Sequence, residues 1–200
     1  MNYRNPRTVN LTPLFVLIGI NILVFFATSI VSHSLWGISD AVTNQIGVSN
    51  ATFSSQPWTI ITAMFAHDGL LHILFNMLAL YFFGMYVIAL VGEARFFLVY
   101  FIGGLIGNAL FLLLAGPNSI AVGASGAVFA LGGLLVVLVP RLKVMIFPVP
   151  VPVDLWIAII IVALISLSPG VAWQAHVGGL LTGIAAGYFF KFQARNRRRY

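Results

Sequence analysis

The chain has 200 residues, of which 60% are hydrophobic and only 7% are charged, and its mean hydropathy is +1.04. An ordinary soluble domain carries about 25% charged residues, so this composition excludes one and indicates a membrane protein. The absence of cysteine excludes disulfides, thiol nucleophiles and cysteine-ligated metal centres. We expect residues 1–200 to form a single membrane domain, because this length suits one compact helical bundle.

Six apolar runs are long enough, or nearly so, to cross a bilayer as helices. They cover residues 14–32, 70–91, 96–115, 122–139, 151–167 and 173–190. Pro148, Pro150 and Pro152 stiffen the entrance to the fifth run, and Asp154 falls in its first turn. The expected fold class is therefore all-α, a polytopic bundle of six transmembrane helices. Residues 33–69 form the one long connection, and its aromatic side chains predict a semi-buried, Ω-type loop at the membrane interface.

The basic residues all lie on one side of the six runs. They are Arg4, Arg7, Arg95, Arg141, Lys143, Lys191, Arg195, Arg197, Arg198 and Arg199. The positive-inside rule places this side, and both termini, in the cytoplasm. Topology and contact with anionic membrane lipids explain the basic tail, so no nucleic-acid partner is expected. The N-terminal segment lacks a signal-peptide pattern, which favours a multi-pass protein of a prokaryotic plasma membrane.

Polar side chains are rare inside the apolar runs, and each is unfavourable in hydrocarbon unless it has a partner or a function. The second run holds His72 and Asn76, which are four residues apart and share a helix face. The fourth run opens near Ser125, and the sixth carries His176. At 1.5 Å per residue, all four residues fall within roughly 10 Å of the predicted outer surface. This convergence predicts a site that is open to water from outside.

The chemistry that these residues support is nucleophilic catalysis. Ser125 needs a base to take its proton, and the pKa of a histidine such as His176 suits that task near neutrality. No acidic residue is expected at the same depth, so the sequence predicts a dyad. Candidate donors to an oxyanion are the amide of Asn76, a ring N–H of His72 and the backbone N–H of Ser125 at the start of the fourth helix.

Glycines flank both members of this candidate dyad. Gly123 and Gly126 allow close backbone approach around Ser125. Gly179 lies three residues after His176, on the same helix face, and Gly183 and Gly187 continue a stripe of small residues. We expect this stripe to pack against the fourth helix. The facing positions predicted there are Gly132 and Gly133.

The polar residues also have other interpretations. A serine between glycines at the head of a membrane helix often caps or packs the helix, and a membrane histidine often bonds to a neighbouring helix. A transporter that uses His72, Asn76 and His176 as a path would need polar groups in the cytoplasmic half of the bundle, which is nearly all apolar. The Gly-x-Ser-x-Gly elbow and the His-Glu-x-x-His metal motif are absent, so no metal is expected.

Taken in order along the chain, the motifs resemble those of the rhomboid intramembrane serine proteases in their minimal six-helix form. The matching pieces are Gly123 to Gly126, His176 with Gly179, His72 with Asn76, Arg95-Phe96 with Tyr100, and Phe65-Ala66-His67. The resemblance implies cleavage of single-pass transmembrane proteins near the outer face, at a segment that unwinds readily, without a cofactor. It also implies that Phe129 stacks on the catalytic histidine and that Phe75 belongs to a lateral gate between the second and fifth helices.

The chain departs from the family pattern at three positions. Trp58-Thr59 stands where many rhomboids have Trp-Arg, Phe129 where they often have tyrosine, and Ile88 where many have glutamate. None of these changes removes a proton-transfer group. The alternative function is a non-catalytic, rhomboid-like protein that binds membrane clients, although such relatives usually lack the serine or the histidine.

Overall fold

The computed structural model of the protein describes residues 9–146 and 149–196. Within them the fold is mostly helical, as predicted, and it departs from the all-α class at two small antiparallel sheets. The main helices are α1 (Thr12–Ser32), α4 (Leu70–Val91), α5 (Glu93–Leu114), α6 (Ser125–Leu138), α7 (Leu155–Ile165) and α8 (Trp173–Asn196). Two short helices and two short strands lie in the loops between them: α2 (Asp40–Ile46), β1 (Val48–Ser49), α3 (Thr59–Thr62) and β2 (Ile120–Ala121).

Three of the described helices, α1, α4 and α5, are long and apolar enough to cross a membrane. The helices α6 and α7 are also apolar but shorter, with 14 and 11 residues. A helix of 14 residues is about 21 Å long, whereas the hydrocarbon layer is about 30 Å thick. Because α6 is shorter than the layer, at least one of its ends must lie within the thickness of the membrane.

The predicted start of the fifth span was wrong. Residues 151–154 belong to β4 (Val149–Asp154), which pairs with β3 (Lys143–Ile146), and α7 begins only at Leu155. Proline favours extended backbone and lacks an N–H, so Pro152 suits a strand better than a helix interior. Asp154 precedes the helix as its N-cap residue, rather than lying in the first turn, and its carboxylate is 2.8 Å from the Lys143 ammonium.

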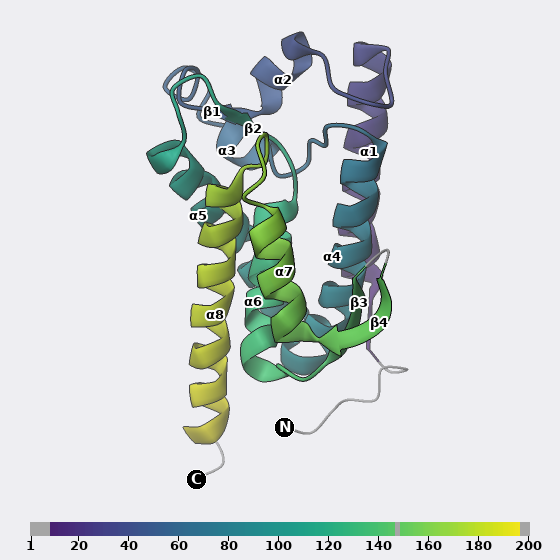
Figure 1. Ribbon diagram of the computed structural model, residues 1–200, viewed down its shortest axis with the longest axis vertical. Helices are drawn as coiled ribbons and strands as arrows, with labels where there is room; N and C mark the ends of the chain where they lie inside the picture. Colours follow the sequence, from purple (N-terminus) through teal and green to yellow (C-terminus); the bar gives the residue numbers. More distant parts are fainter. Residues whose placement is uncertain (1–8, 147–148, 197–200) are drawn as a thin grey trace.

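The helix α6 is the centre of the bundle. Every residue from Gly126 to Leu135 is buried, and α6 packs against α4, α5, α7 and α8, as Figure 1 shows. Its predicted start at residue 122 was three residues early, because Gly123 adopts a φ of +131° that does not occur in a helix. The residue that opens this central helix is Ser125.

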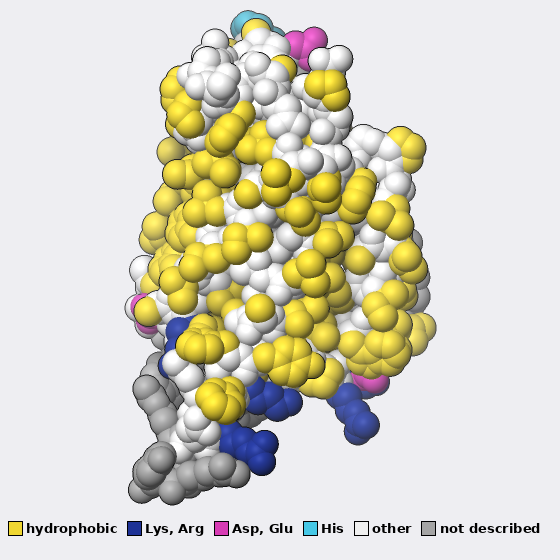
Figure 2. Space-filling model, turned by 90° about the vertical axis from the view of Figure 1, so that its left-hand side faces the viewer, with side chains coloured by type: hydrophobic (Ala, Val, Ile, Leu, Met, Phe, Trp, Pro, Cys, Tyr) yellow, Lys and Arg dark blue, Asp and Glu magenta, His cyan; other side chains and the backbone are white. Residues whose placement is uncertain are grey.

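The two ends of the bundle differ in character. The elements α2, α3, β1 and β2 gather at the upper end in Figure 1, whereas the β3–β4 hairpin, the start of α1 and the end of α8 lie at the lower end. Figure 2 shows a broad apolar surface between the two ends, with the Lys and Arg side chains gathered near the lower one. For the described residues, this distribution agrees with the charge asymmetry of the sequence, which makes the upper end the predicted outer side. Arg4, Arg7, Pro148, Arg197, Arg198 and Arg199 lie outside the described residues.

Candidate active site

Ser125 lies at the head of α6, directly after a turn that only glycine adopts without strain. The φ of Gly123 is +131°, and its N–H donates a 2.8 Å hydrogen bond to the carbonyl of Ala63 in the outer loop. The N-cap residue of α6, Ala124, has no side-chain acceptor to offer the first turn. The first backbone N–H groups of α6 therefore remain available to an anionic group beside Ser125.

The structure brings His176 to Ser125. His176 is on the first turns of α8 and is buried, and its Nε2 lies 2.7 Å from the hydroxyl oxygen of Ser125. The ring of Phe129, one turn along α6, stacks on the imidazole with ring centroids 4.5 Å apart and planes inclined by 18°. Such a stacked ring holds the imidazole in one plane, with Nε2 facing the hydroxyl.

Glycines bring α8 this close to its neighbours. A Cβ at Gly179 would meet the carbonyl oxygen of Gly126, and a Cβ at Gly183 would meet that of Ala130. The prediction for the facing positions was half right. Gly133 does contact α8, through the carbonyl of Leu180, whereas Gly132 faces Phe83 of α4 and Ile159 of α7.

His72 approaches the same place from α4. Its Nδ1 accepts a 3.2 Å hydrogen bond from the N–H of Asp68, so in the neutral ring the proton is on Nε2. That Nε2 lies beside Gly123, where a Cβ would come within 2.9 Å of it and within 3.6 Å of the Ser125 hydroxyl oxygen. The His72 ring therefore places an N–H donor beside Gly123, two residues before Ser125, and glycine is required at position 123 for space as well as for φ.

Asn76 follows His72 by one turn of α4 and is buried. Its amide nitrogen donates a 2.9 Å hydrogen bond to the carbonyl of His72. An amide has two N–H groups, so one remains for another acceptor. Phe75, the residue expected at a gate, lies about half exposed on the surface of α4.

His67 also contacts this site, although its role could not be predicted from the sequence. It is fully buried, and its Nε2 lies 3.4 Å from the N–H of Ala124, while its Nδ1 lies 3.2 Å from the carbonyl of Phe65. Its ring stands edge-on to that of His72, with centroids 5.2 Å apart. Burial, and then the neighbouring His72, lower the pKa of His67 to about 3, so His67 is neutral at physiological pH.

The outer loop is held without the arginine that many rhomboids have after the tryptophan. The Asn108 amide of α5 donates a 2.8 Å hydrogen bond to the carbonyl of Ile60, and the Thr62 hydroxyl donates one of 2.9 Å to the carbonyl of Ile46. The strand β1 pairs with β2 just before the Gly123 turn. These contacts fix the loop against the segment that carries Ser125.

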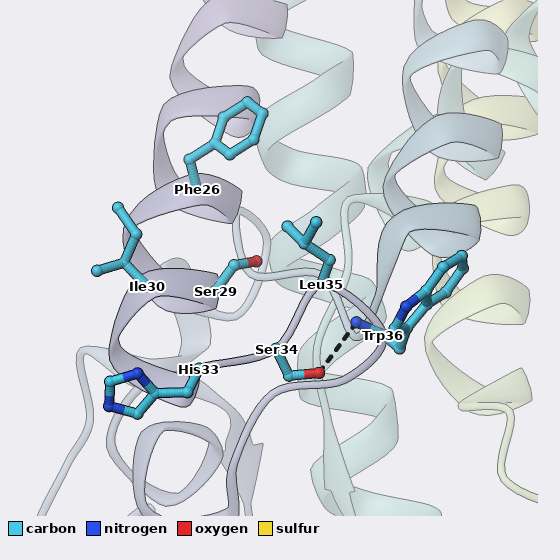
Figure 3. A pocket seen from close by; sticks show the side chains of 7 residues that line it. All are labelled: Phe26, Ser29, Ile30, His33, Ser34, Leu35 and Trp36. Atoms are coloured by element: carbon cyan, nitrogen blue, oxygen red, sulfur yellow. Dashed lines mark hydrogen bonds between the residues drawn. The ribbon is translucent and has the colours of Figure 1, made fainter.

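A hollow of about 480 Å³ opens at the outer end of α1, away from the Ser125 and His176 pair. Figure 3 shows its lining side chains, which come from α1 and from the loop that follows it. In this loop the backbone N–H of Trp36 donates a hydrogen bond to the Ser34 hydroxyl. The lining residues are Phe26, Ser29, Ile30, His33, Ser34, Leu35 and Trp36. They are largely apolar and include none of the candidate catalytic residues.

No charged group completes a triad within the described residues. The second ring nitrogen of His176, Nδ1, is buried and has no hydrogen-bond partner among the residues that the structure describes. Within the same residues, no group of three His, Asp or Glu side chains is placed to bind a metal ion. The arrangement can therefore support nucleophilic chemistry by a serine and a neutral imidazole.

Fold and site together define a polytopic helical membrane protein in which a buried histidine contacts a partly buried serine. The model of the rhomboid domain matches residues 54–192, and the chain belongs to the rhomboid family. It is 36% identical over 146 residues to RHOMBOID-like protein 6, mitochondrial, of Arabidopsis thaliana, with 71% of this chain and 46% of that protein covered. Rhomboid protein 1, mitochondrial, of Saccharomyces cerevisiae is 28% identical over 201 residues, with 92% of this chain and 55% of that protein covered.

Bacterial relatives match as well. The rhomboid-family protein YdcA of Bacillus subtilis is 30% identical over 176 residues, which cover 88% of this chain and 85% of that protein. In contrast, the chain spans about half the length of the plant and yeast relatives. The similarity to rhomboid proteases therefore covers the helices that hold the site, and the YdcA match extends over most of the chain.

Proposed function

We propose that the protein is an intramembrane serine endopeptidase that cleaves single-pass transmembrane proteins near the outer membrane face. Ser125 is the nucleophile and His176 is the general base. The observation that supports this most directly is the 2.7 Å distance between His176 Nε2 and the Ser125 hydroxyl oxygen. This distance is within hydrogen-bond reach of a nucleophile and its base.

In the proposed acylation step, the Ser125 oxygen attacks the carbonyl carbon of the scissile peptide bond as its proton passes to His176 Nε2. The tetrahedral intermediate collapses when the imidazolium returns that proton to the leaving amine, and an acyl-enzyme remains. Water then repeats the sequence with His176 as base, which releases the new carboxylate and regenerates the Ser125 hydroxyl. No cofactor takes part in these steps.

The negative charge on the tetrahedral oxygen needs preorganised donors. In this proposal they are the backbone N–H of Ser125, the His72 Nε2–H and the free amide N–H of Asn76. Two features support the assignment: the tautomer of His72 that the Asp68 N–H favours, and the nearness of His72 Nε2 to Gly123. Phe129 and Gly179 support the dyad by stacking on His176 and by bringing α8 against α6.

The substrate must reach Ser125 in extended form, because a helical peptide bond is shielded by its own turns. We propose that residues 1–200 form one membrane domain of six spans with both termini in the cytoplasm, in a prokaryotic plasma membrane. The gathering of basic side chains at one end supports this topology, and a long bacterial match supports the location. The substrate enters from the lipid past Phe75 of α4.

Purified wild type and three variants test this function. Ser125→Ala and His176→Ala remove the two proposed catalytic groups, and Ser54→Ala removes an exposed serine of the outer loop as a matched control. Each is incubated with a single-pass reporter whose outer juxtamembrane segment is rich in Ala and Gly, and separately with a fluorophosphonate probe. We expect cleavage and labelling by wild type and Ser54→Ala, and neither by Ser125→Ala. Stable binding of the reporter without cleavage or labelling by wild type would instead support the client-binding alternative.

A further inference from the structure

The two-residue segment His67-Asp68 contacts both sides of the proposed oxyanion site. From His67, the side chain reaches the N-cap residue of α6, where Nε2 faces the Ala124 N–H at 3.4 Å. From Asp68, the backbone N–H reaches α4, where it donates to His72 Nδ1 at 3.2 Å. The segments that carry the Ser125 N–H and the His72 Nε2–H thus both contact the same short piece of chain outside the helices.

The contacts of His67 agree on a single protonation state. A carbonyl oxygen only accepts, so the 3.2 Å contact of Nδ1 with the Phe65 carbonyl requires an N–H on Nδ1. A backbone N–H only donates, so the Ala124 contact requires a bare Nε2. Both requirements are met by one neutral tautomer. The lowered pKa of His67, about 3, keeps the ring in that neutral form through the physiological range.

The Ala124 N–H would otherwise be an unpaired donor just ahead of the first turn of α6. The Gly123 N–H is already bonded to the Ala63 carbonyl, so the His67 ring supplies the second of two hydrogen bonds that fix this turn. With both N–H groups occupied, the next donor along the chain is that of Ser125. The direction of the Ser125 N–H is therefore set by the turn that His67 holds.

The segment is itself tightly fastened to the loop after α1. The Leu70 N–H donates to the Leu35 carbonyl at 2.9 Å, and the Ile38 N–H donates to the Asp68 carboxylate at 3.0 Å. Gly69, between them, has a φ of +93°, and a Cβ there would come within 2.8 Å of the Trp36 carbonyl. The loop after α1 thus fixes the backbone next to His67, while the His67 ring contacts Ala124 in the turn before Ser125.

We propose that His67 is a positioning residue that fixes the Ser125 N–H relative to His72. It touches no reacting atom, and it acts through Ala124. The inference rests on the proposed function, because the quantity that His67 controls is stabilisation of the oxyanion. Its loss should lower kcat and leave KM nearly unchanged, since ground-state binding of the substrate does not use the oxyanion donors.

Three variants test the role. His67→Phe keeps a ring of similar size and removes both nitrogens, whereas His67→Gln keeps a neutral acceptor near the position of Nε2. The matched control is His33→Asn, an exposed histidine at the same end of the bundle whose φ of +51° asparagine tolerates. Each is compared with wild type for kcat, KM, the rate of fluorophosphonate labelling of Ser125 and the thermal midpoint in detergent.

We expect His67→Phe to lower kcat and the labelling rate by about 10- to 100-fold, the scale of a misplacement of about 1 Å in an active site, with KM within about twofold. His67→Gln should recover a substantial part of the loss, and His33→Asn should match wild type. The inference is overturned if His67→Phe retains the kcat and labelling rate of wild type, or if Phe and Gln lower kcat equally. Should His67→Phe not fold, the comparison of His67→Gln with His67→Met decides in the same way. An inactive, unlabelled wild type would instead refute the proposed function itself.

Discussion

Gly179 of α8 packs directly on the main-chain carbonyl of Gly126 in α6, with no room for a side-chain atom between them. Gly179 lies three residues after His176, and Gly126 is the residue after Ser125. This close contact therefore adjoins the serine–histidine pair on both helices. Helix packing and the 2.7 Å distance of the pair have the same structural cause.

Enlarging this contact should separate the dyad. Gly179→Ala places a Cβ against the Gly126 carbonyl, and Gly183→Ala does the same at Ala130, so neither backbone can yield without moving a helix. We expect a loss of about 1–3 kcal/mol in the free energy of unfolding for each variant, and a larger fall in activity for Gly179→Ala because it is nearer to His176. Thermal unfolding in detergent and reporter cleavage measure the two effects.

The control for this prediction is Gly19→Ala in α1, where a Cβ would meet nothing within 4 Å. Alanine also favours the helix over glycine by about 1 kcal/mol. Gly19→Ala should therefore be as stable as wild type, or slightly more stable, and equally active. Equal losses for Gly19→Ala and Gly179→Ala would show that the close contact between α6 and α8 is not what sets stability.

The two side-chain donors of the proposed oxyanion site should affect turnover rather than binding. Asn76→Leu and His72→Phe each remove one of the proposed oxyanion donors while keeping most of the side-chain volume; Asn76→Leu also removes the hydrogen bond to the His72 carbonyl. We expect kcat to fall by about 10²- to 10³-fold for each, with little change in KM. Steady-state kinetics on one reporter checks this. A rise in KM at unchanged kcat would place the two residues in substrate binding instead.

The stack between Phe129 and His176 predicts that two substitutions of Phe129 affect kcat to different extents. Phe129→Leu removes the ring that lies 4.5 Å from the imidazole, and a contact of this kind contributes about 0.5–1.5 kcal/mol. We expect kcat to fall by about 2- to 10-fold, because the imidazole is less well oriented. Phe129→Tyr keeps the ring and should stay within about threefold of wild type. The two variants are compared by reporter turnover and by labelling of Ser125, and equal rates for Leu and wild type would exclude an orienting role.

The β3–β4 hairpin should show an acid-dependent contribution to stability. The hydrogen bond from Lys143 holds the pKa of Asp154 below its ordinary value of 3.8. A carboxyl with a lowered folded-state pKa stabilises the fold at pH values above the ordinary pKa, and this contribution is lost as the pH falls through the folded-state pKa. Asp154→Asn should therefore lower the thermal midpoint slightly at pH 7, and the difference should vanish near pH 2. A difference that persists unchanged in acid would assign the effect to helix capping.

Much of the helical frame follows from the sequence alone. The predicted run 70–91 coincides with α4 (Leu70–Val91), because Gly69 and Gly92 mark its two ends with positive φ angles. The proximity of Ser125 and His176 could also be anticipated, since a polar side chain in an apolar run is a strong signal. The hairpin β3–β4 was missed because this proline-containing run is apolar enough for a membrane span. Its prolines nevertheless prevent the backbone hydrogen bonds of a continuous helix.

His67 and Asn108 could not be assigned from pattern in the same way. His67 belongs to the motif Phe65-Ala66-His67, but the motif gives it no role, and only the fold brings its ring to Ala124. Asn108, in contrast, did carry a signal, because it is polar within the apolar run 96–115. Its partner, the carbonyl of Ile60, is 48 residues away in the outer loop, a distance that periodicity does not reveal.

The anchoring of the outer loop by Asn108 gives the last prediction. Asn108→Leu leaves the Ile60 carbonyl without its 2.8 Å donor, and an unsatisfied buried group costs about 1–3 kcal/mol. The loop that Asn108 holds also bonds to Gly123 through Ala63, so its release should loosen the turn that presents Ser125. We expect faster proteolysis within residues 33–69 and a reduced rate of Ser125 labelling. Asn50→Ala, which removes a weaker 3.3 Å bond to the Ala115 carbonyl at the exposed side of the same loop, should change both much less. Equal sensitivity of the two variants would mean that Asn108 is no special anchor and that the missing arginine is compensated elsewhere.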